Sequence, residues 1–395
     1  METTTLTGNI TPLDSIATLE AEWRALEADC DSSFFTSWSW IGPWLQTIGR
    51  DLEMFVYRCH RRRHEQPDQL IALCILGRSQ VQRRLFQANT LALNEIRSKG
   101  RNMSIEYNGL LVHRDFEAPA WHRFILDLCA ADIEWEELGL SAIPKRCFDY
   151  LNNHMLPTEI QVDEQLHPWV VDLGAADTLD RLLSRYSSRR RWHIRRAMRE
   201  YEKEGEIEIS AAQTKEQALR YFDRMCDLHT QRWNQIGQAG SYANPARTAF
   251  HRELINRNFE RNEIQLLRVR CAERTIGYLY TFLWRGGVYG LQSGFQIEGD
   301  NIRSPGYISH CLAMVFSARQ GMHSYDLMCG DSEYKKNLAQ PGEPLIWCRV
   351  QRPHWKFTLE NLLLRVHRRV RAIDRPKAIM ANRRAPLKQA SGQAG

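Results

Sequence analysis

The sequence predicts a mixed α/β (α+β) protein in two halves, each built on a mostly antiparallel sheet flanked by helices. The chain has 395 residues, which exceeds the roughly 100 to 200 residues of a single domain. Its hydrophobic fraction of 43% is enough for sizeable cores. Runs with the 3.6-residue helical period alternate with short strand-like runs, and several of these are joined by turns that fit antiparallel hairpins.

The first half is expected to begin with an amphipathic helix over 14–30. The aromatic stretch 34–48 follows, and the helical spacing of its tryptophans favours a place in the core. Strand-like runs at 53–59 and 70–78 flank a polar turn, which predicts a hairpin. The other elements expected here are a strand at 109–112, a helix at 116–131, a strand at 136–141 and a short helix at 145–154.

A boundary between the halves is expected within 160–178, where prolines and Gly174 interrupt the pattern. We assign 1–165 to an N-terminal half, 166–375 to a C-terminal half and 376–395 to a disordered basic tail. The C-terminal half is expected to contain helices at 177–187, 189–204, 215–235, 244–261 and 306–320, strands at 264–271, 275–284, 287–295, 323–328 and 345–352, and a last helix at 358–373.

The net charge of +6 is unevenly distributed. Residues 185–203 carry eight basic and two acidic side chains, and residues 365–388 carry nine basic and one acidic side chain. Such patches indicate a solvated face, or a surface for phosphate, nucleic acid or an acidic membrane. The basic C-terminal helix is therefore a candidate for peripheral membrane contact.

The most specific stretch is 289–336. Its loop, Arg303-Ser304-Pro305-Gly306, leads into the helix at 306–320. Ser304 is expected to cap this helix and Gly321 to end it in a left-handed conformation. A helix start preceded by such a loop offers free amides and a positive dipole end, which suit a phosphate or pyrophosphate.

The order of strand, R-x-x-G loop, helix and strand resembles the acyl-CoA binding core of the GNAT N-acetyltransferases. Tyr325-Asp326, Gly330-Asp331 and Tyr334-Lys335-Lys336 follow. Together they resemble the BioF2-like or CelD-like acetyltransferase domain, a relative of the FemAB peptidyltransferases. Ile308 departs from this pattern, since GNAT loops usually have a small residue there.

The resemblance extends upstream over about 180 to 350. The run 188–197, SRRRWHIRRA, is similar to the segment that opens the catalytic half in this group, and 229–240 resembles its H-x-x-R-W-x-x-x-G stretch. The first half matches more weakly, at 34–38 and 105–109. FemAB-type proteins carry two GNAT-like halves packed together, so the resemblance implies two GNAT-like halves here.

The resemblance also implies where the donor binds. The loop and the central strand would hold acyl-CoA as a co-substrate, with no cofactor bound permanently. Glycines inside a strand mark a bulge or a close backbone approach, and Gly290 and Gly294 bracket the segment that would face the thioester. The donor-binding residues expected are Arg303, Ser304, Gly306, Gln292 and Ser293.

Acyl transfer to an amine also needs a stabilised oxyanion and a deprotonated amine. Lys335, next to Tyr334, occupies the place of the aromatic-lysine pair that FemAB-type enzymes present to the reacting carbonyl. Asp331 lies within reach of the same turn and could take a proton from the amine, or pair with the lysines. We predict Lys335, Asp331 and Tyr334 as catalytic residues.

The acceptor side is less specific. Glu95, Glu106 and Asn108 are polar residues flanked by apolar ones and could hold the acceptor amine. Arg195 and Arg196 belong to the arginine-rich segment, whose guanidinium forks suit a phosphorylated donor or acceptor. A satisfied polar group beside a strand explains Glu95, Glu106 and Asn108 nearly as well. For most of the arginines taken singly, a solvated basic face is the preferred explanation.

Other classes of protein are disfavoured. The ten cysteines have no C-x-x-C pairing and read as reduced core thiols, and no His pair has zinc-binding spacing, so we expect no metal. No apolar run approaches the ~20 residues that span a bilayer, and the N-terminus does not resemble a signal peptide. We expect a cytoplasmic protein.

The predicted function is N-acyl transfer from acyl-CoA to an amine of a sugar, peptide or lipid-linked cell-envelope or polysaccharide precursor, in EC class 2.3.1. One alternative is FemAB-like transfer from aminoacyl-tRNA, which the arginine-rich segment favours. Another alternative is a non-catalytic nucleic-acid or envelope-associated binding protein that keeps the fold as a scaffold. Its main support is Ile308, which departs from the small residue usual in GNAT loops.

Overall fold

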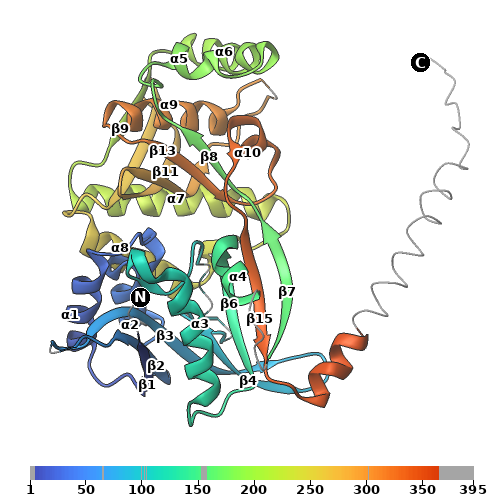
Figure 1. Ribbon diagram of the computed structural model, residues 1–395. Helices are drawn as coiled ribbons and strands as arrows, with labels where there is room; N and C mark the ends of the chain where they lie inside the picture. The colour runs from blue at the N-terminus through green and yellow to red at the C-terminus, as the bar shows by residue number, and fades with distance from the viewer. Residues whose placement is uncertain are drawn as a thin grey trace, which may run out of the picture.

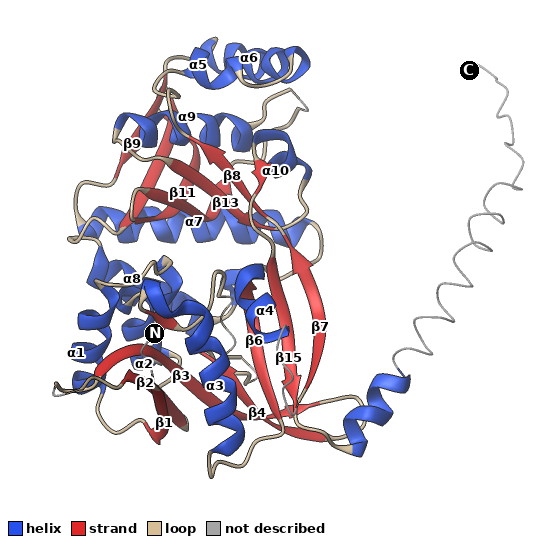
Figure 2. Cartoon of the chain, viewed as in Figure 1, coloured by secondary structure: helices blue, strands red, loops and turns tan. Residues whose placement is uncertain are grey.

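A computed structural model describes residues 5–64, 66–98, 100–101, 103, 105–152, 158–300 and 302–363. The chain folds into two halves, one above the other in Figure 1. Each half is a twisted sheet with helices packed on it, as Figure 2 shows. The predicted fold class is therefore confirmed. The predicted disordered tail lies outside the described residues.

The N-terminal half contains the predicted helices and hairpin, together with strands that the sequence did not reveal. Its elements are β1 (Leu6–Pro12), α1 (Ile16–Glu27), a 3-10 turn (Phe34–Thr36), α2 (Trp38–Thr47), β2 (Met54–Arg61), β3 (Gln69–Gln82), β4 (Gln87–Leu93), β5 (Leu111–Val112), a 3-10 turn (Arg114–Phe116), α3 (Glu117–Ala130), β6 (Glu137–Pro144), α4 (Lys145–Asn152) and β7 (Glu159–Leu166).

The C-terminal half follows the predicted order closely. Its elements are β8 (Pro168–Asp172), α5 (Leu179–Ser184), α6 (Ser188–Glu202), β9 (Ile207–Ala211), α7 (Lys215–Gln235), a 3-10 turn (Ser241–Ala243), α8 (Pro245–Asn258), β10 (Ile264–Cys271), β11 (Arg274–Trp284), β12 (Gly287–Phe295), α9 (Pro305–Arg319), β13 (Ser324–Cys329), α10 (Glu333–Leu338) and β14 (Gln340–Pro341). The chain then returns to the first sheet as β15 (Leu345–Gln351), and the last described element is a helix over 355–363.

The two sheets share one design. The first has the order β1-β2-β3-β4-β6-β15-β7, with β5 beside β3, and the second has the order β14-β8-β13-β12-β11-β10-β9. All pairings are antiparallel except β4 with β6 and β12 with β13, which are parallel. Each half therefore has a single parallel pair near the middle of its sheet.

The placement of the strand predicted at 345–352 was wrong. We expected it in the sheet of the C-terminal half, but β15 lies between β6 and β7 in the first sheet. Figure 1 shows β15 in orange-red, running down into the lower half. An apolar run in the sequence does not reveal which sheet it joins. Because β7 and β8 belong to different sheets, we still propose that the boundary between the halves lies near residue 165, with β15 as a later return to the first sheet.

Aromatic side chains join the halves. Trp40 and Trp44 are 1% exposed, which confirms the aromatic stretch as core. Phe34 stacks on Phe282 of β11 with ring centroids 4.2 Å apart, and Trp40 meets Phe250 of α8 edge to face at 4.9 Å. Burying each such side chain stabilises the fold by about 1.5–3 kcal/mol. The N-terminal half is thereby fixed against the strands and helices that position the site.

All ten cysteines are free, as expected for core thiols. In the part of the chain that the structure describes, we find no helix that combines the length and the apolar character needed to span a bilayer. The same residues contain no group of three or more His, Cys, Asp or Glu side chains placed to bind a metal.

Candidate active site

The central parallel pair of the C-terminal sheet opens into a cavity. Strand β12 pairs with β13 only over Gly287–Tyr289 and Ser324–Asp326, and beyond these residues the strands separate. A cavity of about 270 Å³, which we call the central cavity, lies in this gap. Its walls include Phe35, Trp40, Met103 and Glu106 from the N-terminal half, Gly290–Ser293 of β12, His251 of α8, His310 of α9, Leu327–Cys329 of β13, and Tyr334 and Lys335 of α10.

Both strands are distorted where they part. On β12, Gly290 and Leu291 together oppose the single residue Thr281 of β11, which is a β-bulge. On β13, the register with β8 shifts after Asp326, and Met328 has a φ of 64°. The bulge predicted from the glycines is confirmed at Gly290. At Gly294 an added Cβ would overlap the backbone carbonyl oxygen of Met225, so the predicted close approach is confirmed there.

In the first half, hydrogen bonds bridge the end of the corresponding parallel pair. Its parallel pair, β4 with β6, ends at Ala92 and Gly139. The chain that follows β4 closes the end of that pair, because the side chain of Asn94 donates to Asn108 Oδ1 at 3.0 Å and the backbone N–H of Asn108 donates to Ala142 O at 3.2 Å. The predicted residue Asn108 is fully buried in this network and does not line the central cavity. The same segment carries Glu106 to the other half.

Lys335 projects into the central cavity from α10. Its ammonium donates to the carbonyl oxygens of Cys329 at 2.6 Å and Met328 at 3.3 Å. An ammonium has three N–H donors, so a third remains for a ligand. Burial lowers the pKa of Lys335, and the nearby Glu106, Cys329 and Asp326 oppose that shift. The lysine is therefore held in a fixed position by the end of β13.

Two carboxyl groups lie close to Lys335. Glu106 Oε2 accepts the backbone N–H of Cys329 at 2.8 Å, and burial raises the pKa of Glu106 against the effects of that bond and of Lys335. Asp326 accepts the hydroxyl of Tyr107, and its other oxygen accepts the N–H of Met328 at 2.7 Å. Burial raises the pKa of Asp326 to about 7. Glu106 lines the cavity, whereas Asp326 lies behind it.

His310 is a cavity residue that sequence reasoning missed. It is 4% exposed, stacks on Tyr334 with ring centroids 5.6 Å apart, and shares a hydrogen bond of 3.3 Å between Nδ1 and the hydroxyl of Tyr325. Its Nε2 has no partner among the described residues. Burial, with Lys335 nearby, lowers the pKa of His310 to about 3, so the ring is neutral. In the sequence, His310 stands within an apolar helical pattern, and this pattern does not indicate that the side chain lines a cavity.

A second hollow of about 340 Å³, the outer pocket, lies on the other side of α10. Tyr334 and Lys335 of this helix face the central cavity, and Glu333 and Asn337 face the outer pocket. The remaining walls are Ser187, Arg189, Arg190, His193 and Ile194 at the start of α6, and Ser304 and Tyr307 at the start of α9.

The start of α9 matches the predicted loop in part. Ser304 is the N-cap residue, but its side chain makes no capping hydrogen bond, so the predicted side-chain cap was wrong. Gly321, by contrast, has the predicted positive φ, at 82°. The N–H groups of Gly306 and Tyr307 lie in the first turn, where a helix offers no internal partner. A Cβ on Gly306 would approach the Phe295 ring to 3.2 Å, so a side chain there would require that ring to shift slightly.

Arg303 and Ile308 point away from both hollows. Arg303 pairs with Glu204 and lies over the Tyr201 ring at 5.6 Å. Ile308 is fully buried in the core of the C-terminal half. Since its side chain faces the core, it does not obstruct the amides at the start of the helix.

The other predicted residues lie apart from the two hollows. Asp331 is exposed and pairs with Lys336 at 2.8 Å, which lowers its pKa. Glu95 is buried against Ser141, at 2.6 Å, in the N-terminal half. On the outer face of α6, Arg195 pairs with Asp180 at 2.8 Å, and Arg196 lies over the Trp192 ring at 5.1 Å. The structure thus brings together Glu106, Gln292, Ser293, Tyr334 and Lys335 of the predicted set.

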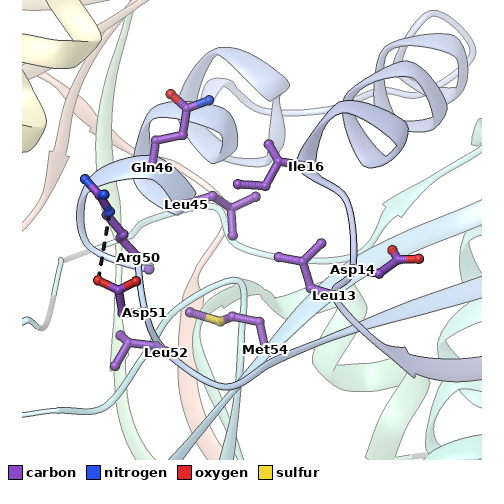
Figure 3. A pocket seen from close by; sticks show the side chains of 10 residues that line it. Leu13, Asp14, Ile16, Leu45, Gln46, Arg50, Asp51, Leu52 and Met54 are labelled. Atoms are coloured by element: carbon purple, nitrogen blue, oxygen red, sulfur yellow. Dashed lines mark ion pairs between the residues drawn. The ribbon is translucent and has the colours of Figure 1, made fainter.

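A wider hollow of about 510 Å³ lies elsewhere in the N-terminal half. Figure 3 shows its apolar side chains, including Leu13, Leu45 and Met54, facing one another. Its ion pair, Arg50 with Asp51 at 3.9 Å, is largely exposed to solvent. No buried titratable group lines this hollow, so it lacks the means for acid, base or oxyanion chemistry.

Comparisons with known proteins agree with the C-terminal geometry. Residues 187–336 match the acetyltransferase (GNAT) domain family. Among solved structures, FemX is similar over 86% of this chain and 96% of its own, with a TM-score of 0.52 and 10% identity. This level of identity supports the fold alone. No match was found among curated proteins.

Two further solved structures are similar at lower scores. One is a conserved protein of unknown function from Bacteroides thetaiotaomicron VPI-5482, with a TM-score of 0.49, 12% identity, and coverage of 87% of this chain and 99% of that chain. The other is L-PGS from Bacillus licheniformis, with a TM-score of 0.49, 9% identity, and coverage of 87% and 94%. The fold assignment therefore rests on FemX. The match of residues 187–336 to the GNAT acetyltransferase domain supports a transferase role, and the chain as a whole has a fold similar to that of FemX.

Proposed function

We propose that this protein is an N-acyltransferase that moves an acyl group from acyl-CoA to an amine of a sugar, peptide or lipid-linked cell-envelope or polysaccharide precursor. The observation that carries the proposal is the central cavity. There the free edge of bulged β12, the ammonium of Lys335 and the carboxylate of Glu106 converge where two strands part. A backbone edge, a cation and a base are what acyl transfer to an amine needs.

The donor would bind across the start of α9. Ser304 and Tyr307, at the start of α9, line the outer pocket together with Arg189 and Arg190. The N–H groups of Gly306 and Tyr307 belong to the same first turn of the helix. Arg190 donates to the backbone and side-chain oxygens of Asn337, and Asn337 donates to the Tyr307 hydroxyl at 2.9 Å. These bonds fix Arg190, while Arg189 remains exposed. Amides and guanidinium groups together suit the phosphates of CoA.

The acyl group would then lie against β12 in the central cavity, near Gln292 and Ser293. Glu106 takes a proton from the incoming ammonium, and the free amine attacks the thioester carbonyl carbon. The carbonyl oxygen gains the electron pair and is stabilised by the third N–H of Lys335. When the carbon–sulfur bond breaks, CoA leaves as the thiolate, the attacking nitrogen loses its extra proton to that thiolate, and the neutral amide remains. A fixed donor of this kind is worth about 3–4 kcal/mol in the transition state.

A thermal-shift experiment tests the donor without knowledge of the acceptor. The full chain is heated with acetyl-CoA, with longer acyl-CoAs and with free CoA. Ligand at about 100 times its Kd stabilises a folded protein by about 2.7 kcal/mol, so a clear rise in Tm is expected. Arg189→Ala should reduce the rise, and Arg199→Ala, exposed on the same helix but outside the outer pocket, should not. No rise with any CoA species would overturn the acyl-CoA donor.

A FemAB-like transfer from aminoacyl-tRNA is the second candidate. The observation that favours it is the exposed basic face of α6, which carries Arg195 and Arg199 beyond the outer pocket. Binding of charged tRNA with a steep salt dependence, and no response to CoA, would support this candidate instead. The non-catalytic alternative loses its main reason, because Ile308 is a core residue.

A further inference from the structure

The last described helix exposes an apolar face at the edge of the N-terminal half. In Figure 1 this helix follows β15 in red-orange at the lower right. Trp355 is 73% exposed, Leu359 42%, Leu362 57% and Leu363 48%. Their spacing places all four on one side of a helix. We call these four residues the C-terminal apolar face.

The opposite side of the same helix is packed, so the exposed side chains have a defined direction. Phe357 and Glu360 are 2% and 3% exposed. Phe357 meets the ring of Phe86 at 5.4 Å, and Glu360 accepts the guanidinium of Arg83 at 3.1 Å and the backbone N–H of Arg84 at 3.3 Å. The tip of the β3–β4 hairpin therefore holds the helix with its leucines facing outward.

The hairpin tip extends the apolar face. Leu85 lies between Arg84 and Phe86 in the turn that contacts the helix, and it is 57% exposed. Half of the large hydrophobic side chains that are exposed among the described residues thus gather on this one edge of the molecule. Scattered exposed apolar residues need no explanation, but a group of this kind marks an interaction surface.

The sequence that follows shows what kind of partner fits. Residues 365–388 carry nine basic and one acidic side chain. The apolar spacing also continues in the sequence at Val366, Val370 and Ile373, outside the described residues. Nucleic acid would pair with the arginines but would leave the leucines and Trp355 exposed to water. A bilayer with anionic headgroups takes both, because the apolar side chains enter the interface and the basic ones meet the lipid phosphates.

We propose that the C-terminal apolar face docks the protein peripherally on membranes rich in anionic lipid. The surface lies on the N-terminal half, apart from the central cavity and the outer pocket, and shares no residue with either. The proposal does not depend on the acyl donor, and docking would place the cavity near lipid-linked acceptors.

Vesicle co-sedimentation of the full chain tests the proposal. We expect binding to vesicles of phosphatidylcholine mixed with phosphatidylglycerol, weaker binding to phosphatidylcholine alone, and loss of binding as salt is raised. Leu359→Ser with Leu362→Ser should weaken binding at least about tenfold, because two apolar side chains would no longer enter the interface. Arg368→Glu with Arg369→Glu should weaken binding to the anionic vesicles and not to phosphatidylcholine.

The matched control is Leu126→Ser with Ile236→Ser, two exposed apolar residues on α3 and at the end of α7. This variant should bind as the wild type does, and circular dichroism should show that all variants are folded. Equal binding by the Leu359/Leu362 variant and the wild type would overturn the proposal. The proposal would also be overturned if the full chain bound no vesicles and instead self-associated or bound nucleic acid, and if the Leu359/Leu362 variant lost that other interaction. The acetyl-CoA thermal shift should be unchanged in all of them, which separates this test from that of the proposed function.

Discussion

Glu106 accepts the backbone N–H of Cys329 at 2.8 Å, although the two residues belong to different halves of the protein. The next residue, Tyr107, has a φ of 51° and donates its hydroxyl to Asp326 on the same strand. Together these bonds attach the N-terminal half to the end of β13, beside the ammonium of Lys335. The N-terminal half thereby completes the site that the C-terminal half begins.

Replacement of Lys335 by Met should remove the proposed oxyanion donor. We expect kcat to fall about 10²–10³-fold with little change in the KM for acyl-CoA. Thiol release from acetyl-CoA with an accepted amine measures both constants. Lys336→Met is the matched control, because Lys336 is the adjacent lysine and pairs with exposed Asp331. Equal loss in both variants would contradict the assignment.

The pH dependence of kcat/KM should reflect Glu106 and Lys335. Burial raises the pKa of Glu106, so activity that needs its carboxylate should be lost, as pH falls, at a higher pH than for an ordinary glutamate. Burial lowers the pKa of Lys335, so activity that needs its ammonium should be lost, as pH rises, at a lower pH than for an ordinary lysine. Glu106→Gln should remove the acidic limb and leave the alkaline limb. An unchanged acidic limb would show that another group is the base.

Asp326 should make the protein less stable at neutral pH than at mildly acidic pH. Its pKa rises from 3.8 to about 7 on folding, so the folded chain holds the proton more tightly than the unfolded chain. The contribution of this group to the free energy of unfolding therefore falls as pH rises from about 4 to about 7, by on the order of 4 kcal/mol. Asp326→Asn should remove this part of the dependence. Parallel Tm curves for wild type and variant over that range would contradict it.

Gly294 should not tolerate a side chain. A Cβ there would overlap the backbone of α7, which cannot move as a side chain can. We expect Gly294→Ala to lower the free energy of unfolding by about 1–3 kcal/mol in chemical denaturation. Gly299→Ala is the control, because a Cβ at Gly299 meets nothing within 4 Å. Similar midpoints for the two variants would be inconsistent with the packing of α7 on β12.

The local hydrophobic pattern predicted the helices and strands correctly where the residues of a single segment determine its secondary structure. The helix at 215–235 and the strands at 264–271 and 287–295 have the predicted bounds. Strands β7 and β8 were not predicted, because the prolines in and beside them indicated a boundary between the two halves. The place of β15 depends on a pairing with β6 and β7 that lie far away in the sequence.

The residues of the site were likewise predictable only where they belong to one continuous stretch of sequence. Lys335 and the loop before α9 belong to one continuous motif, so the sequence indicated them. Whether Glu95, Glu106 or Asn108 reaches the cavity depends on how a segment of the N-terminal half crosses to β13, and only Glu106 does so. His310 lies in an apolar helix, and its role in the cavity follows from its stacking on Tyr334.

Hydrogen exchange of the backbone amides, with and without acetyl-CoA, tests the central claim most directly. The account predicts slower exchange in peptides that contain Gly306 and Tyr307 and in those that cover Gly290–Ser293, with no change around the apolar hollow at Leu13 and Met54. If acetyl-CoA slowed exchange neither at the start of α9 nor at the bulge of β12, the result would contradict the placement of the donor between the separated strands.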